Sequence, residues 1–481
     1  MHTIASYFVY RLCWELLENA IAASCAALFF AIHPIHIESV CWISASNEIL
    51  YTIFFLSSVL IFAHGIRTPP PQRLWLSVGL WSAALFSKET AIALLPIFPL
   101  LGFSRGHWDG WRARLRVALH MGTPYLVPAV IYLAVRWLVL RGVGVEIGKH
   151  SWQQVFCSSP SLLLFYFKKL AWPVRLSGFY LNPLVSRPSS EMWLTLLPIL
   201  AGVVLLAWLA VRYSRCIGLA GCLILLPLIP ALAATRVYDQ GNMAHDRYLY
   251  LPSVGFSLLF GLSATKLWSG SLARKALLTA FASALLVACV YLTITQQRFY
   301  RTDESFYSRA IEIAPENVLV IDYLGNTFLR QGQHERALEE LTRAHQLAPG
   351  DANATFFLAR GLFEDRQYAA AKPYLEDLSG SGSISTRRRR LILLSLAIAE
   401  FRLGDTDRAE HTLWQLEALD PQYRGLHRTL AIIYHYKGDI LEAQKQYARE
   451  FQVSGDLEAR NKAIELARFL RSSRKGLTLP F

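Results

Sequence analysis

The first 298 residues are dominated by long apolar stretches with short polar segments between them, a pattern that predicts a polytopic membrane protein. A membrane-spanning helix needs about 20 mostly apolar residues, and shorter helices are tolerated where protein covers their ends. Several stretches are short, which favours a bundle with internal cavities. We expect about ten spans, at 3–17, 19–33, 49–65, 74–87, 89–104, 118–140, 192–211, 217–234, 251–266 and 275–294.

A further apolar stretch, 158–173, is interrupted by Lys168, Lys169 and Pro173. These residues are unfavourable in the middle of a span, so we interpret the stretch as an interfacial or re-entrant helix.

Beyond residue 298 the apolar positions follow a long repeat. Four leucines, each followed by Gly or Ala, recur at spacings of 34, 38 and 34 residues, and four alanines recur with the same spacings. They are Leu324, Leu358, Leu396 and Leu430, and Ala337, Ala371, Ala409 and Ala443. A period of 34 residues with small residues at fixed positions is typical of tetratricopeptide repeats, whose paired helices approach closely.

We therefore predict an all-α protein with a membrane helical bundle over 1–298 and a soluble tetratricopeptide α-solenoid over 299–481. A half repeat at 302–315 leads into the solenoid, and a helix near 457–470 caps its end. The four residues by which one period exceeds 34 lie in the segment 379–390, which we predict to be a loop.

Charge supports the same division. The chain carries a net charge of +13 and is 53% hydrophobic. Residues 1–298 hold 23 Lys and Arg against 10 Asp and Glu, whereas residues 299–481 hold 25 of each. The excess lies in short loops, where it controls topology, so we expect no nucleic-acid partner. Basic loops at 67–73, 105–116, 212–215 and 266–275 predict the cytoplasmic side, which places the repeats and Met1 on the opposite side.

Three polar clusters lie on that opposite side, where ionisable residues next to spans are costly and usually functional. The first is HPIHIESVCWISASNEIL, which starts at His33. The second is LFSKETAIALLP, with Lys88 and Glu89 at a tight turn. The third is AHDRYLYLPSVG, which contains Asp246 and Arg247 and precedes a span.

In this order, and followed by tetratricopeptide repeats, the three clusters resemble the transmembrane and tetratricopeptide-repeat family of C-type (GT-C) glycosyltransferases, including its bacterial members. HPIHIESV and DRYLYLPS carry the resemblance, which extends over the whole chain. It implies an enzyme that takes a sugar, mannose in animal relatives, from a polyprenyl-phosphate donor. The acceptor would be a protein or another hydroxyl compound, which the repeats bind.

The sequence departs from the family in two places. Family members usually have a basic residue, often GRK, after HPIHIESV, where this chain has Ala45, Ser46 and Asn47. They also begin with an additional span and an external loop that supplies the catalytic carboxylate, which we expect this chain to lack. We interpret this as a truncated gene model or a late start site, with a genuine short form as the alternative, and its activity stays open.

An inverting sugar transfer needs a base for the acceptor hydroxyl and cations for the phosphate leaving group. We expect Glu38 and Glu48 to be catalytic. The candidate substrate-binding residues are His33, His36, Lys88, Glu89, Arg136, Asp246, Arg247 and Tyr248, with Lys168 and Lys169 as further phosphate ligands.

Several alternatives stay open. Lys88 with Glu89, and Asp246 with Arg247, could form structural ion pairs, and Tyr248 could belong to an interfacial aromatic belt. A divalent cation at His33, His36 and Glu38 is a further alternative, although we assign no certain cofactor or metal site. The whole chain could be a membrane-anchored scaffold for protein partners. We expect a bacterial inner membrane with periplasmic repeats, or else an endoplasmic reticulum membrane with luminal repeats.

Overall fold

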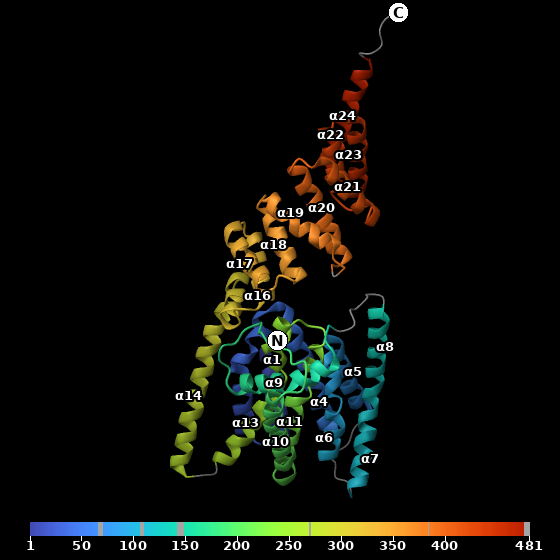
Figure 1. Cartoon of the computed structure of the whole chain (residues 1–481). Coiled ribbons are helices and arrows are strands. Elements are labelled where there is room, and N and C mark those ends of the chain that lie inside the picture. Colours follow the sequence, from blue (N-terminus) through green and yellow to red (C-terminus); the bar gives the residue numbers. More distant parts are fainter. Residues whose placement is uncertain (66–70, 106–109, 142–148, 269–270, 383, 476–481) are drawn as a thin grey trace, which may run out of the picture. The chain divides into compact units, whose positions relative to one another are not determined.

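The computed structural model describes all residues except 66–70, 106–109, 142–148, 269–270, 383 and 476–481. The chain forms two compact units, Met1–Asn317 and Val318–Phe481, and the described residues are mainly helical and contain no strand (Figure 1). The all-α prediction is therefore confirmed. The basic loops predicted at 67–73, 105–116 and 266–275 lie partly outside the described residues.

The first unit consists of α-helices joined by short 3-10 turns. The α-helices are α1 His2–Leu17, α2 Ala20–Ile32, α3 Ile37–Cys41, α4 Ser46–Gly65, α5 Pro71–Ser87, α6 Ile97–Arg105, α7 Trp111–Gly122, α8 Leu126–Arg141, α9 Trp152–Ala171, α10 Ser190–Arg212, α11 Arg215–Leu225, α12 Leu228–Ala234, α13 Pro252–Trp268, α14 Leu272–Gln297 and α15 Asp303–Ile313. The 3-10 turns are η1 Pro34–His36, η2 Ile43–Ala45, η3 Glu89–Leu94, η4 Thr123–Tyr125, η5 Gln240–Asn242, η6 Asp246–Leu249 and η7 Arg298–Tyr300.

Fewer helices than predicted are long enough to cross a membrane. Within the described residues, five stretches meet the requirement by length and composition, and a sixth exists if α2 and the helix after it, bent by 49°, count as one. The five are Ile43–His64, Trp111–Leu140, Ser190–Arg212, Arg215–Ala234 and Leu272–Tyr300. The expectation of about ten spans is larger because it also counted short apolar helices such as α1 and α13. Others, such as 89–104, are divided between a 3-10 turn and a helix.

The bundle core lies where α1, α2, α4, α5, α6 and α13 pack together. Its centre is aromatic: the Phe98 and Tyr125 rings stack with centroids 3.7 Å apart, and Trp81 meets both at its edges. In contrast, α10 and α14 expose most of their apolar side chains, as expected for helices that face lipid.

The second unit is a series of helical hairpins that pack in chain order (Figure 1). Its helices are α16 Val318–Arg330, α17 His334–Leu347, α18 Ala352–Glu364, α19 Tyr368–Gly380, α20 Thr386–Arg402, α21 Thr406–Leu419, α22 Leu426–Tyr436, α23 Ile440–Ser454 and α24 Leu457–Lys475. The repeat positions explain the pairing, because Ala337, Ala371, Ala409 and Ala443 are all fully buried. At Gly325 a Cβ would lie 2.6 Å from the Leu341 side chain, so a larger residue there would separate α16 from α17.

The segment 379–390 differs from the prediction of a loop. Helix α19 continues to Gly380, and α20 begins at Thr386, where the Ser385 side chain accepts a hydrogen bond from the Arg388 amide. The run of arginines therefore lies on a helix. Arg388 bonds the Asn353 side chain and Arg390 pairs with Asp420, so these cations are used within the repeats.

The boundary between the compact units falls after Asn317, later than the predicted boundary at 298/299, because the lead-in helix α15 packs with the first unit. The Phe306 ring lies so close to Gly178 that a Cβ there would be 2.3 Å from it. Similarly, the Asn317 amide donates to the Gly241 carbonyl at 3.0 Å. Glycine at these two positions lets α15 and its C-terminal end approach the loops of the membrane unit.

Most of the tight turns inside the hairpins need a left-handed backbone. Gly332, Gly404 and Gly438 have positive φ at equivalent positions, and Arg366 occupies this position in the second hairpin with φ of 62°. A Cβ added at Gly404 would have no neighbour within 4 Å, so glycine is needed there only because of its positive φ.

We predict that Gly404→Ala lowers the free energy of unfolding of the repeats by about 1 kcal/mol, because an L-residue disfavours φ of +88°. Amide hydrogen exchange in the whole chain measures this. Gly350→Ala is the matched control, because Gly350 also has open space around it but no positive φ. Equal losses in the two variants would contradict the backbone explanation.

Asp322 on α16 is a buried acid in the repeats. Its side chain is 1% exposed, and Oδ1 has no hydrogen-bond partner among the described residues. Burial raises the pKa of Asp322 to about 8, the Asp351 charge adds to this, and Arg388 opposes it. The folded repeats therefore hold a proton on this carboxyl that the unfolded chain releases near pH 4.

We predict that Asp322 makes the repeats progressively less stable between about pH 4 and pH 8. The folded-state pKa is raised, so the stabilising proton is fully present below the unfolded pKa and is lost as pH rises through the folded pKa. Asp322→Asn should remove this part of the pH dependence. Hydrogen exchange of α16 amides at several pH values measures the difference between variant and wild type, and parallel profiles would contradict the prediction.

Candidate functional site

Glu38 lies on the short helix that follows the end of α2. The chain turns there because His33 ends α2 with an extended backbone and Pro34 starts η1. The Glu38 side chain is buried, and its two oxygens accept hydrogen bonds from one residue of the third polar cluster. Oε1 accepts from the Arg247 guanidinium at 2.7 Å, and Oε2 accepts from the Arg247 backbone amide at 2.8 Å. This ion pair joins two segments that are 209 residues apart in sequence.

Glu48, in the first turn of α4, forms the second buried ion pair, with Lys88. Lys88 immediately follows α5 and precedes η3, so the pair ties the first polar cluster to the second. The second carboxylate oxygen of Glu48, Oε2, is buried and has no hydrogen-bond partner among the described residues. Only Oε1 of this carboxylate is therefore paired among the described residues.

Tyr248 lies between the two pairs. The Lys88 ammonium is 4.9 Å from the centre of the Tyr248 ring, and the Arg247 guanidinium is 5.3 Å from it. Arg247 also lies 5.0 Å from the Trp42 ring. Glu38, Glu48, Lys88, Arg247 and Tyr248 are called the charged cluster below. It has two positive and two negative side chains, so its formal charge is zero.

The residues next to each other in sequence do not pair with each other. Arg247 binds Glu38 instead of Asp246, and Lys88 binds Glu48 instead of Glu89. The two pairs considered from the sequence, Lys88 with Glu89 and Asp246 with Arg247, are therefore replaced by pairs with Glu48 and Glu38. Tyr248 contacts the two cations, which an interfacial belt would not require.

Asp246 points to the other side of the same turn, where it holds the loop after α9. Its oxygens accept hydrogen bonds from the Ser177 amide at 3.0 Å and from the Tyr180 hydroxyl at 2.8 and 2.9 Å. Burial raises the pKa of Asp246 to about 7, the Glu38 charge adds to this, and Lys169 opposes it. Asp246 is therefore a positioning residue for the loop.

Lys169 supports this loop as well. Its ammonium donates to the carbonyls of Val174 and Arg175, at 3.0 and 2.8 Å, and lies 4.8 Å from the centre of the Tyr180 ring. Ser177 and Tyr180 were missed in the sequence, because the segment 141–191 has no periodic or motif signal there.

The histidines are held mostly by backbone groups. His33 Nε2 lies 3.1 Å from the Leu170 carbonyl, and its Nδ1 accepts from the Ile35 amide. His36 lies among aromatic rings, with Ser253 Oγ 3.4 Å from its Nε2. His245 lies near the carbonyls of Gly178 and Asn242, and burial together with the Arg247 charge lowers the pKa of His245 to about 3.

A cation site at His33, His36 and Glu38 does not form. No group of three or more His, Cys, Asp or Glu residues in the described part of the chain is placed to hold a metal ion. The physical reason is that His33 and Glu38 already use their ligand atoms, on Leu170, Ile35 and Arg247.

Glu89 and Arg136 lie outside the charged cluster. Their side chains are about half exposed, and they approach each other at 3.9 Å. Glu89 begins η3 and diverges from Lys88, whose side chain is only 11% exposed. The structure therefore brings together Glu38, Glu48, Lys88, Arg247 and Tyr248 from the predicted set, whereas Glu89 and Arg136 form a partly exposed pair outside that cluster.

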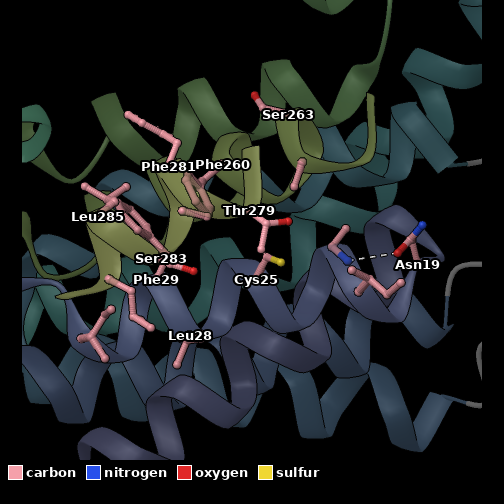
Figure 2. A pocket seen from close by; sticks show the side chains of 16 residues that line it. Asn19, Cys25, Leu28, Phe29, Phe260, Ser263, Thr279, Phe281, Ser283 and Leu285 are labelled. Atoms are coloured by element: carbon pink, nitrogen blue, oxygen red, sulfur yellow. Dashed lines mark hydrogen bonds between the residues drawn. The ribbon is translucent and has the colours of Figure 1, made fainter. Parts of the chain in front are cut away.

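An apolar groove of about 700 Å³ lies between α2, α13 and α14. Figure 2 shows side chains from these helices around it, including Leu28, Phe29, Phe260 and Leu285. Phe29 connects the groove to the polar region, because its ring centre is 5.2 Å from that of His33. A groove of this composition fits a hydrocarbon chain.

Comparison with known proteins first identifies the class of repeat in the second unit. The tetratricopeptide repeat family matches residues 328–382, which lie in α16 to α19 and the following linker. The second unit thus contains tetratricopeptide repeats, as the 34-residue period predicted. Among solved structures, the chain is similar to YrrB, a TPR protein with an unusual peptide-binding site, with 16% identity and a TM-score of 0.31. That similarity covers 38% of this chain and 89% of YrrB.

Sequence similarity also identifies particular relatives of the chain. The chain is 22% identical over 404 residues to the human protein O-mannosyl-transferase TMTC3, covering 75% of this chain and 42% of the relative. It is 24% identical to human TMTC1, covering 70% of this chain and 43% of the relative. Drosophila melanogaster Tmtc2 is 35% identical over 131 residues, covering 27% of this chain and 14% of the relative. The chain thus spans less than half the length of these relatives, whose names agree with the resemblance inferred from HPIHIESV and DRYLYLPS.

We predict strong coupling between Glu38 and Arg247 in a double-mutant cycle. Either single substitution to Ala leaves a buried charge without its partner and should cost about 3 kcal/mol, whereas the double variant should lose far less than the sum. Unfolding of the chain in detergent measures these losses. The exposed pair Lys149–Asp239, at 3.1 Å, is the control and should show coupling below about 1 kcal/mol. Additive losses at Glu38 and Arg247 would contradict the prediction.

Proposed function

We propose that this chain belongs to the membrane O-mannosyltransferases and transfers mannose from a polyprenyl-phosphate donor to a protein hydroxyl. The observation that carries the proposal is the charged cluster, in which three separate sequence motifs meet around two buried ion pairs. The similarity to proteins named protein O-mannosyl-transferases supports the sugar and the acceptor class.

The proposed chemistry assigns each part of the cluster a role. The acceptor oxygen forms a bond to the anomeric carbon, the bond from that carbon to the phosphate oxygen breaks, and its electron pair stays on the phosphate. Glu48 Oε2 takes the hydroxyl proton. Lys88 and Arg247 stabilise the charge on the phosphate, and the Glu38 carboxylate orients the guanidinium.

The two carboxylates also explain how the cations remain stable without substrate. Buried Lys and Arg need a counter-charge, and Glu48 and Glu38 supply it. A donor phosphate would compete with Glu48 for Lys88, and the carboxylate released in this way is a stronger proton acceptor. The apolar groove between α2, α13 and α14 offers a place for the polyprenyl chain.

We further propose that the repeats lie on the extracytoplasmic side and select the acceptor, in a bacterial inner membrane or in the endoplasmic reticulum. The distribution of basic loops supports this side, and the tetratricopeptide match supports a protein partner. His33 and His36 keep the role of positioning the donor, next to Phe29 at the groove.

A second candidate function is a membrane-anchored scaffold. The tetratricopeptide match at 328–382 favours it, because such repeats bind protein partners without catalysis. In that case the two ion pairs serve only to hold the bundle together.

We predict that Lys88→Ala lowers the rate of mannose transfer from polyprenyl-phosphate-mannose to a threonine peptide by at least about a hundredfold. Its control is Lys149→Ala, which removes an exposed lysine paired with Asp239 and should leave transfer unchanged. Radiolabelled donor measures the rate in detergent, and a thermal unfolding curve checks that both variants are folded. Equal, measurable rates for folded Lys88→Ala and wild type would contradict the role of Lys88, whereas no transfer by folded wild type would favour the scaffold.

A further inference from the structure

Each cation of the charged cluster lies against two aromatic rings. The Lys88 ammonium is 5.5 Å from the centre of the Tyr51 ring and 4.9 Å from that of Tyr248. The Arg247 guanidinium is 5.0 Å from the centre of the Trp42 ring and 5.3 Å from that of Tyr248. All four distances are within the range of about 6 Å in which a ring face attracts a cation. Each cation therefore has one ring of its own, and the two cations share Tyr248.

The cations are more accessible than the carboxylates that neutralise them. The Arg247 and Lys88 side chains are 19% and 11% exposed, whereas those of Glu38 and Glu48 are 0% and 1% exposed. An anion that enters from solvent therefore meets the cations first. If a phosphate displaces Glu48 from Lys88, the ammonium loses its carboxylate partner. It can keep its ring contacts, because a ring is neutral and holds a cation through its face.

The Tyr248 ring is held by groups other than the two cations. The backbone amide of Tyr248 donates to the His245 carbonyl at 3.3 Å, within the turn that includes η6. The His245 ring lies edge-on to the Tyr248 ring, with centres 5.2 Å apart. Tyr248 also packs against the buried apolar residues that include Leu162 and Tyr166 of α9. The position of the ring is therefore set by the fold around it.

A shared ring also limits how far apart the cations can be. Both distances end at the same ring centre, so the ammonium and the guanidinium cannot be farther apart than the sum of the two. Lys88 follows α5 and Arg247 lies in η6, so the two residues come from separate segments. A phosphate offers several charged oxygens and can accept hydrogen bonds from more than one cation.

We propose that Tyr248 is a positioning residue for the phosphate of the donor. Its ring holds Lys88 and Arg247 beside each other so that both can bind one phosphate, and it keeps Lys88 in place when the phosphate displaces Glu48. This inference rests on the proposed function for the identity of the phosphate compound, but the binding can be measured without sugar transfer.

The test is the affinity of radiolabelled polyprenyl phosphate for the whole chain in detergent, measured by a scintillation proximity assay without acceptor. Tyr248→Leu removes the shared ring and should weaken binding about tenfold, which corresponds to about 1.4 kcal/mol. Tyr248→Phe keeps the ring and loses only the hydroxyl, so its affinity should stay within about twofold of wild type.

Two controls separate positioning from a general effect on the fold. Trp152→Leu removes a ring that also lies 4.9 Å from a cation, Arg236, but outside the charged cluster, and it should bind polyprenyl phosphate like wild type. Polyprenol of the same chain length lacks the phosphate. Its affinity should be equal in wild type and Tyr248→Leu, whereas a disrupted membrane unit would bind both compounds more weakly.

Four results would each overturn the proposal. They are an unchanged polyprenyl phosphate affinity in Tyr248→Leu, an equal loss in Tyr248→Phe, an equal loss of polyprenol affinity in Tyr248→Leu, and no measurable binding of polyprenyl phosphate to wild type. The second result would show that the hydroxyl acts instead of the ring.

Mannose transfer by wild type, measured in parallel, separates this inference from the proposed function. Polyprenyl phosphate binding that depends on the Tyr248 ring, in a chain that transfers no mannose, would support the positioning role and contradict the transferase. Transfer by wild type together with binding that is the same in Tyr248→Leu would contradict only the positioning role.

Discussion

The buried ion pair between Glu38 and Arg247 is the interaction on which the arrangement of the polar region depends. Glu38 accepts both from the guanidinium and from the backbone amide of Arg247, so it fixes the side chain and the main chain of η6 together. With this turn in place, Asp246 faces the loop after α9 and Tyr248 faces Lys88. Loss of either charge would leave its partner buried without a counter-charge, so the two residues stabilise the fold only when both are present.

The loop after α9 connects η6 with α15. Asp246 and Lys169 hold it from one side, and Gly178 lets the Phe306 ring of α15 pack on it from the other. The helix that leads into the repeats is therefore built onto the same loop that the third polar cluster positions. Directly packed and hydrogen-bonded groups therefore connect α15 with η6.

The two units use small residues for different purposes. In the repeats, Gly325 and the buried alanines let helices pair closely, and glycines with positive φ close the hairpins. In the membrane unit, Gly178 and Gly241 mark places where a distant segment docks. The first kind recurs with the repeat period and can be seen in the sequence, whereas the second kind has no periodicity and becomes evident only from its neighbours.

The sequence alone determined the division into apolar helices and a 34-residue helical repeat, because hydrophobic periodicity reflects local structure. It also placed Glu38, Glu48, Lys88, Arg247 and Tyr248 among the candidates. Only the tertiary structure decided which charges pair, since Glu38 and Arg247 are 209 residues apart and Lys88 faces Glu48 instead of its neighbour Glu89. It also brought in Ser177 and Tyr180 and set Arg136 apart, because such contacts depend on how helices pack, which no local pattern records.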